Sequence, residues 1–157
     1  MTNAATQIRR LFLERKGTYT FPEAAEILGM ELDVVLGWLE VGELEGIDTR
    51  DGIVLPWDEL VSFGMSFWPQ EAIEAALGSD LADAIPELLR LAALEVRIPR
   101  LEIVALERLA ERDGKSIDAI LARELLDVVS AHSEYLGSVI PGFATALSWP
   151  QHEETKA

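Results

Sequence analysis

One short segment, residues 94–98, limits what this chain can fold into. Leu94, Val96 and Ile98 alternate with two charged residues, which is the period of a strand with one apolar face. A single strand beside two helices can neither cover its apolar side chains nor pair its backbone amides and carbonyls. The sequence therefore predicts that this strand pairs with the same strand of a second copy, with Leu94, Val96 and Ile98 in the dimer contact.

Two helices are predicted after Pro99, which ends the strand. The first runs from about Arg100 to Arg112 and stops at an Asp-Gly pair, and Ser116 is a suitable N-cap for the second, which reaches about His132. The apolar residues at helical spacing are Ile103, Leu106, Leu109 and Ala110 in the first helix and Ile117, Ile120, Leu121, Leu125, Val128 and Val129 in the second. Residues 93–132 are therefore predicted to form one module of strand, helix, glycine turn and helix.

The N-terminal part of the chain predicts two short helices and a hairpin. Thr20 and Glu23 have the spacing of a capping box, which starts a helix within residues 18–29. A second amphipathic helix is expected at about residues 31–41. The pair Asp51-Gly52 is a two-residue turn signal ahead of the strand-favouring residues 53–55. A short helix from Trp57 completes a domain predicted over residues 1–66.

Residues 67–92 are predicted to be a helical linker between the two parts of the chain. Their helical pattern is interrupted near Gly78-Ser79, and Pro86 limits the regularity of the second piece.

The charge of the chain argues against nucleic acid as a general partner. There are 13 basic and 28 acidic side chains, which gives a net charge of −15. Within residues 17–80 the only cation is Arg50, whereas residues 91–115 carry five cations and five acidic groups. Such an acidic chain is repelled by nucleic acid. Because charges beyond a Debye length of about 8 Å are largely screened, the locally balanced region can still meet phosphate.

The composition and the motifs argue against several classes of protein. The chain has no cysteine, and His132 and His152 have no second ligand at a metal spacing, so neither a disulfide framework nor a metal site is expected. Neither a glycine-rich phosphate loop nor a catalytic triad spacing is present, so we expect no cofactor and no enzymatic activity. No stretch approaches the roughly 18 apolar residues that span a bilayer, so we expect a cytoplasmic protein without membrane contact.

Two motifs in the C-terminal half carry a resemblance. Arg-Ile-Pro-Arg at residues 97–100 and Asp-Gly-Lys-Ser-Ile-Asp at residues 113–118, together with their spacing, resemble the ribbon-helix-helix family of the Arc and MetJ repressors and many bacterial antitoxins. The resemblance implies an obligate homodimer whose strands pair antiparallel and enter the major groove. It also implies that the outward side chains of Ala93, Glu95 and Arg97 read bases, and that the backbone amides of Lys115 and Ser116 hold a phosphate.

An alternative remains for this module. Residues 93–130 would then serve dimerisation only, with Arg97 and Glu95 paired across the two strands.

A second resemblance lies in residues 19–60. The shared features are Thr20 with Glu23-Ala24-Ala25-Glu26, Leu28-Gly29, the turn Gly42-Glu43-Leu44, and Ile53-Val54-Leu55-Pro56 followed by Trp57-Asp58-Glu59-Leu60. They resemble the winged helix-turn-helix of the MerR and excisionase class, which implies a small DNA-binding unit. The second helix departs from that pattern, because it carries Glu31, Asp33 and Glu40 and no lysine or arginine. A protein-facing or structural role therefore stays open for this module.

Residues 133–157 form a predicted C-terminal tail with aromatic residues up to position 149. Tyr135, Phe143 and Trp149 are the anchors with which it either binds a partner protein or packs back on the N-terminal module. The remaining tryptophans are expected in the core or in an interface.

The sequence thus predicts a mainly α protein: a winged helix-turn-helix with a small hairpin, then a ribbon-helix-helix whose intersubunit ribbon is a two-stranded antiparallel sheet. The function it favours is a homodimeric transcriptional repressor that binds operator DNA, as the antitoxin of a toxin–antitoxin pair would. The alternative is a protein-interaction adaptor that keeps both folds without binding DNA.

Overall fold

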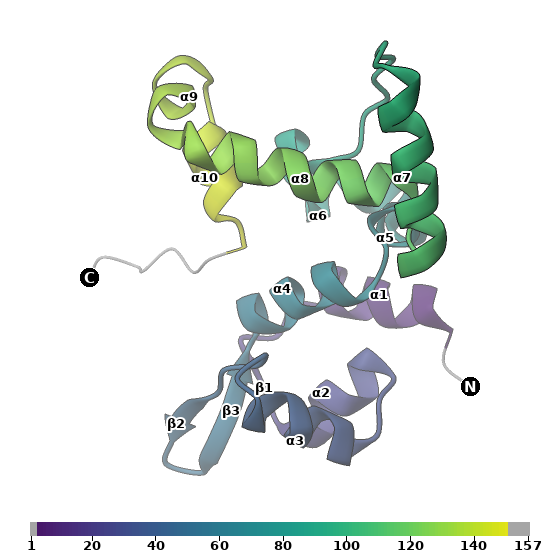
Figure 1. Cartoon of the computed structure of the whole chain (residues 1–157). Coiled ribbons are helices and arrows are strands. Elements are labelled where there is room, and N and C mark those ends of the chain that lie inside the picture. The colour runs from purple at the N-terminus through teal and green to yellow at the C-terminus, as the bar shows by residue number, and fades with distance from the viewer. Residues whose placement is uncertain (1–2, 151–157) are drawn as a thin grey trace. The chain divides into compact units, whose positions relative to one another are not determined.

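The computed structural model describes residues 3–150, which divide into two compact units. The first unit comprises residues 3–91 and 148–150, and the second comprises residues 92–147. The described chain is mainly helical, with one small antiparallel sheet of three strands (Figure 1). The mainly α fold class is thereby confirmed.

Helix α1 (Ala4–Leu13) opens the first unit, and the sequence analysis assigned no element there. Its N-terminus is capped by Asn3, whose side chain accepts a hydrogen bond from the amide of Ala5 at 3.0 Å. Ile8, Leu11 and Phe12 are buried on one face of the helix. This face joins a hydrophobic core whose fully buried members all lie between Ile8 and Ile85.

Two short helices follow, as predicted. Thr20 and Glu23 form the expected capping box at the start of α2 (Phe21–Leu28), and α3 (Leu32–Glu40) comes directly after it. Gly29 ends α2 in the left-handed conformation, with φ of 67°. A Cβ at this position would lie 2.2 Å from the side-chain nitrogen of Gln7 and would displace the end of that side chain, whereas the positive φ itself favours glycine.

The sheet has the strand order β1-β3-β2, with β1 (Thr18–Tyr19) pairing along β3 (Gly52–Pro56). Strand β2 (Ile47–Thr49) forms the predicted hairpin with β3. Thr49 pairs with Gly52, so the two loop residues are Arg50 and Asp51, one position earlier than the turn signal indicated. Gly52 starts β3 with φ of 118°, which explains the glycine beside the turn. Helix α4 (Trp57–Phe67) then begins directly after Pro56.

The segment predicted as a linker is part of the first unit. It contains α5 (Gln70–Leu77), η1 (Gly78–Asp80), α6 (Leu81–Ala84) and η2 (Glu87–Leu89), with the expected break at Gly78. Ile73, Leu77 and Ile85 are buried in the same core as α1. The physical reason is that α1 presents an apolar face that these residues cover, and α1 was not foreseen.

An arginine fixes the end of α5 to α1. The guanidinium of Arg9 donates to the carbonyls of Ala76 and Leu77 at 3.0 and 3.2 Å and to the carboxylate of Asp80 at 2.6 Å. It thus satisfies carbonyls that have no partner at a helix C-terminus.

The second unit consists of helices and one segment without regular structure. No helix or strand is assigned to residues 91–99; α7 (Arg100–Asp113) and α8 (Ile117–Ala131) follow as predicted. Gly114 ends α7 in the left-handed conformation, and the Ser116 side chain caps α8 by accepting from the amide of Ala119 at 3.1 Å. The tail adds α9 (Ser133–Val139) and α10 (Phe143–Ser148), which the sequence analysis did not assign.

Candidate functional site

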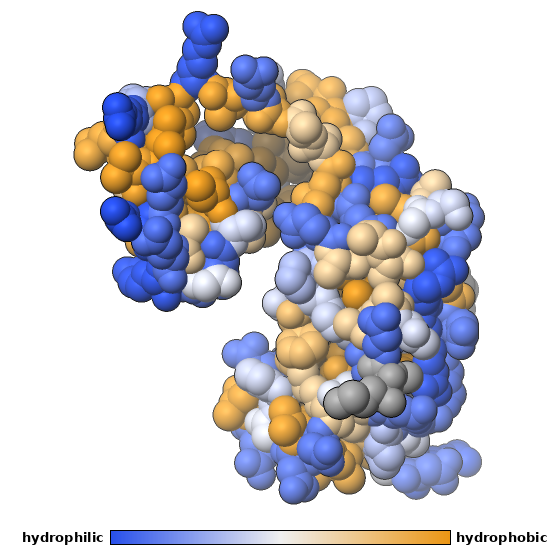
Figure 2. Space-filling view, turned by 90° about the vertical axis from the view of Figure 1, so that its right-hand side faces the viewer, coloured by the Kyte–Doolittle hydropathy of each residue, from blue (hydrophilic) through white to orange (hydrophobic). Residues whose placement is uncertain are grey.

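The second unit has almost no interior. Within residues 92–147, all of which the structure describes, Ala146 is the only buried side chain. The large apolar side chains open to solvent there are Leu94, Val96, Leu101, Ile103, Val104, Leu109, Leu125, Leu126, Val128, Tyr135, Val139 and Leu147. Figure 2 shows apolar side chains gathered over this unit, at the top of the view. An exposed apolar surface of this extent marks a contact surface for another molecule.

The predicted strand contributes the most open part of this surface. Leu94 is 80% exposed and Val96 is 55% exposed, while Ile98 is half-buried. No strand is assigned because a strand is defined by its pairing, and residues 94–98 have no partner strand within one copy. Dimerisation through Leu94, Val96 and Ile98 therefore stays a prediction.

The three proposed base-reading side chains lie on the same segment. Ala93, Glu95 and Arg97 are all exposed. Arg97, like Arg100 and Arg123, forms neither an ion pair nor a side-chain hydrogen bond with any other described residue. Although acidic side chains outnumber basic ones in this chain, these arginines keep their full hydrogen-bonding capacity for another molecule.

Other cations of this unit are paired locally. Arg108 bonds Glu111 at 2.9 Å, one turn further along α7. Arg112 bonds the neighbouring Asp113 at 2.7 Å, and this hydrogen bond lowers the pKa of the Asp113 carboxyl below its usual value. The carboxylate therefore stays charged beside the turn that leads into α8.

The turn between α7 and α8 provides half of the expected phosphate site. The amide of Lys115 donates to the carbonyl of Ala110 at 3.2 Å, as part of the C-terminal cap of α7, so it is not free to bind phosphate. The amide of Ser116 has no such partner among the described residues, and it lies at the start of α8, where the helix dipole favours an anion. The correction concerns Lys115, whose amide the glycine turn uses.

Helix α3, the reader implied by the winged helix-turn-helix resemblance, has a different surface. Val35 is its only buried residue, while Leu32, Val34 and Leu36 are exposed beside the acidic groups of residues 31–40. Arg50, the one cation of residues 17–80, lies in the loop between β2 and β3. This face therefore offers apolar and acidic groups, with no cation on the helix itself to meet a phosphate.

The three aromatic anchors of the tail have different surroundings. Tyr135 is 67% exposed, and Phe143 is half-buried. Trp149 packs against the core of the first unit, with its ring edge-on to Trp57 at 6.4 Å between centroids. Trp149 therefore serves the fold of this chain rather than an open partner surface, and the tail in this part packs back on the N-terminal module. His152 and the rest of residues 151–157 lie outside the described residues.

Trp57 is the centre of a contact that joins three segments. Its indole nitrogen donates to the carbonyl of Leu11 at 2.8 Å, and the guanidinium of Arg15 lies 4.1 Å from the centroid of its ring. Together with Trp149, these contacts hold the end of α1 and the end of the described chain on the same buried side chain.

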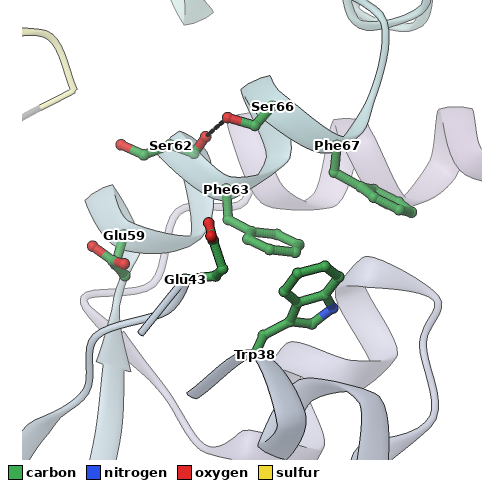
Figure 3. A pocket seen from close by; sticks show the side chains of 7 residues that line it. All are labelled: Trp38, Glu43, Glu59, Ser62, Phe63, Ser66 and Phe67. Carbon is green, nitrogen blue, oxygen red and sulfur yellow. Dashed lines mark hydrogen bonds between the residues drawn. The ribbon is translucent and has the colours of Figure 1, made fainter. Parts of the chain in front are cut away.

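The sequence analysis missed a pocket of about 320 Å³ between α3 and α4 of the first unit. Figure 3 shows the rings of Trp38, Phe63 and Phe67 on one side of it and the carboxylates of Glu43 and Glu59 on the other. Ser62 and Ser66 complete the wall. A signal was present in the sequence, since Phe63 and Phe67 are one helical turn apart and therefore share one face of α4.

Neither a membrane span nor a metal cluster is found in the part of the chain that the structure describes. None of its helices is both long and apolar enough to cross a bilayer. No group of three or more His, Asp or Glu residues among residues 3–150 could hold a metal ion. Comparisons with protein-family models, with curated proteins and with solved structures found no match to this chain.

Proposed function

We propose that this chain is a homodimeric DNA-binding transcriptional repressor that reads its operator through the paired segments of residues 93–98. The observation that carries the proposal is the unpaired guanidinium of Arg97, on an exposed segment whose apolar residues lack any cover within one copy. The proposal keeps the ribbon-helix-helix architecture for residues 93–132 and the winged helix-turn-helix architecture for residues 1–66.

Dimerisation follows from the missing interior. A second copy would pair its residues 94–98 with these and place Leu94 and Val96 of both copies against the four helices. Such pairing also satisfies the backbone amides and carbonyls of the segment. Burial of apolar surface contributes about 25 cal/mol per Å², so covering these exposed side chains would stabilise a dimer.

Base reading follows from the alternation. When the apolar side chains of residues 94–98 face the helices, Glu95 and Arg97 face outward on the ribbon. An arginine in the major groove binds guanine through two hydrogen bonds, and a glutamate accepts a hydrogen bond from the amino group of cytosine. Arg100 and the amide of Ser116 are then available for the phosphates on either side.

The biological role proposed is repression of the chain's own transcription, as an antitoxin paired with a toxin. The family resemblance and the acidic first unit support this role. A basic partner protein would be attracted by the first unit, and DNA would be bound by the second.

A second candidate function rests on a specific observation. Helix α3 exposes apolar and acidic side chains where a winged helix-turn-helix would expose cations. Such a surface on α3 suits a protein-interaction adaptor, which would dimerise through residues 94–98 and bind no DNA.

The experiment that separates them measures binding to DNA from upstream of the chain's own coding sequence, by fluorescence anisotropy. Arg97→Ala is compared with Arg108→Ala, which removes the same charge from a residue already paired with Glu111. Each arginine–guanine contact contributes about 1–3 kcal/mol, and a dimer has two, so we expect Arg97→Ala to weaken binding by at least about tenfold. Arg108→Ala should change affinity only slightly.

Three outcomes would contradict a repressor that reads DNA through residues 93–98. Equal effects of the two substitutions would show that the ribbon does not read bases. If the unaltered protein forms no specific complex, the adaptor is the better function. Loss of binding in Arg50→Ala alone would make the winged module the reader.

A further inference from the structure

The outward face of α4 is unusual for a surface helix. Phe63 and Phe67 stack on this face, with ring centroids 6.0 Å apart, and Phe67 is 47% exposed. Trp38 of α3 meets Phe63 edge-on at 5.7 Å. Three aromatic rings thus form one wall of an open pocket. Other residues of α4 supply its fully buried contacts with the core.

The acidic side of the pocket is held in place by the backbone. The amide of Glu43 donates to the carbonyl of Trp38 at 2.9 Å, which ties the backbone of Glu43 to the helix that carries the tryptophan. One carboxylate oxygen of Glu59 accepts from the amide of Glu45 at 2.9 Å, which ties α4 to the same loop. The backbone of Glu43 and the carboxylate of Glu59 are therefore held near the rings before any ligand arrives.

The charge of the pocket has no internal partner. Among the described residues, neither Glu43 nor Glu59 forms an ion pair, and no cation lines the pocket. A ring face attracts a cation through its quadrupole, and a carboxylate attracts it through its charge. A guanidinium satisfies both groups at once, because it stacks on a ring and donates in its own plane to carboxylates.

The surface beside the pocket is apolar. Val34 and Val41 lie four residues before and three residues after Trp38 in the α3 segment, so they lie on the same side of it. They are 45% and 69% exposed. A segment with apolar residues next to its cation would cover them.

We infer that this pocket binds an arginine or lysine side chain on an exposed basic segment of a partner protein. Charge complementarity selects a partner of different sequence over a second copy. Each copy carries a net charge of −15, so a second copy is repelled as a whole while a basic partner is attracted. Arg97, Arg100 and Arg123 of a second copy lack partners among the described residues of their own chain, and their binding here would appear in the test as self-association. The inference concerns the first unit alone and does not depend on DNA binding by residues 93–98.

The test titrates the full chain with a short capped peptide whose central arginine is flanked by leucines. The indole N–H signals of the tryptophans are followed by NMR at physiological salt. We expect a saturable shift of the Trp38 signal, with little change at the buried Trp57 and Trp68. A peptide with citrulline in place of arginine has the same shape without the charge, and it should bind at least about tenfold more weakly.

Two variants and one matched control locate the binding. Glu43→Gln and Phe67→Ala should each raise the Kd of the arginine peptide by about three- to tenfold. Phe67 is half open to solvent, and thermal unfolding followed by circular dichroism checks that its variant folds. Glu71→Gln removes the same charge from an exposed residue of α5, and it should leave the Kd within about twofold, since screening limits distant charges.

Each contrary outcome overturns the inference. An equal effect of Glu71→Gln and Glu43→Gln would mean that only the net charge of the chain attracts the peptide. Equal binding of the citrulline peptide would make the pocket a site for apolar groups. A change of oligomeric state in Phe67→Ala, seen by sedimentation, would assign the pocket to a second copy of this chain.

Discussion

The two units of this chain are both built from short amphipathic helices, but they use their apolar residues in opposite ways. In the first unit, α1 packs on α2, α4 and α5, while α2 and α4 also contact the small sheet, and side chains such as Leu11, Leu60 and Leu77 are completely buried. In the second unit, α7 and α8 contact one another, and their apolar faces stay largely open. Two helices touch along one line only, whereas several elements in different directions can enclose a volume.

The two units also differ in how many of their cations have partners within the same unit. In the first unit, Arg9, Arg10 and Lys16 bond to acidic groups of the same unit, and Arg15 lies over Trp57. In the second unit, three arginines have no partner among the described residues. The comparison teaches that the first unit is complete as a single copy, while the second has both the apolar and the charged groups of an intermolecular surface.

The largest effect is expected from Val96→Asp. If Val96 is buried between two copies, the substitution places unpaired carboxylates in the interface at a cost on the order of 3–5 kcal/mol. We expect dissociation in sedimentation experiments and loss of the helical signal of residues 100–131. Tryptophan fluorescence should stay unchanged, because all four tryptophans belong to the first unit.

Leu88→Asp is the matched control for this experiment. Leu88 is 54% exposed against 55% for Val96, but it lies in the first unit. It should change neither the oligomeric state nor the circular dichroism. Similar effects of both substitutions would remove the distinction between the units.

The next largest effect is expected from Leu77→Ala. Leu77 is fully buried, so the substitution should lower the free energy of unfolding of the first unit by about 2–5 kcal/mol. Denaturant unfolding followed by tryptophan fluorescence measures it. Leu88→Ala, an exposed leucine of the same segment, should cost less than about 1 kcal/mol. An unchanged stability in Leu77→Ala would return residues 67–91 to the role of a linker.

A smaller effect is expected from Trp149→Ala. The substitution removes an edge-on ring contact with Trp57 and some apolar burial, so the first unit should lose about 1–3 kcal/mol. Tyr135→Ala, at a side chain 67% exposed, should stay within about 0.5 kcal/mol. Thermal unfolding of both variants makes the comparison. A tail independent of the first unit would show no loss in either variant.

The smallest effect concerns Glu23. The hydrogen bond from Lys16, followed by that from the amide of Thr20, lowers the pKa of Glu23 from its ordinary value of 4.5 to about 2. A lowered carboxyl pKa stabilises the folded state above the unfolded value, and this contribution is lost as the pH falls from about 4.5 through about 2. Both side chains are more than one-third exposed, so screening reduces the contribution to below about 1 kcal/mol at neutral pH.

Glu23→Gln isolates this charge, since its carbonyl oxygen can still accept from the amide of Thr20. We expect wild type to be slightly more stable than the variant at pH 6 and equal to it near pH 2, as measured by urea unfolding. A difference that does not change with pH would assign the effect to the capping hydrogen bond. Glu26→Gln, which removes the exposed ion-pair partner of Arg10 from the same helix, is the matched control.

Much of the fold could be predicted because the signals are local. The capping box at Thr20, the left-handed Gly29 and Gly114, the N-cap Ser116 and the hairpin before Pro56 depend on residues within a few positions of one another. The same signals limited the analysis elsewhere. Lys115 was expected to offer its amide to phosphate, but the Gly114 turn that the sequence predicts requires that amide for the cap of α7.

The candidate site could be predicted only in part. The alternation of residues 94–98 is visible in the sequence, and it led to the expectation that one copy leaves Leu94 and Val96 uncovered. The structure shows both side chains exposed. The pocket was not foreseen, because Trp38 and Phe67 look like core residues when each is considered alone. Its lining residues come from α3, α4 and the loop after α3, and only the packing of these segments leaves the rings facing a space.

The sequence by itself indicated α2, α3, α7 and α8 and the turns that end α2 and α7, since the hydrogen bonds of caps and turns join neighbouring residues. It also predicts that residues 94–98 pair with a partner strand, and this pairing stays a prediction. The tertiary structure alone decided that α1 and residues 70–85 share one core, that Trp149 packs on Trp57, and that Trp38 meets Phe63 edge-on in the wall of a pocket. Burial depends on which distant surfaces meet, and no pattern within one segment specifies that.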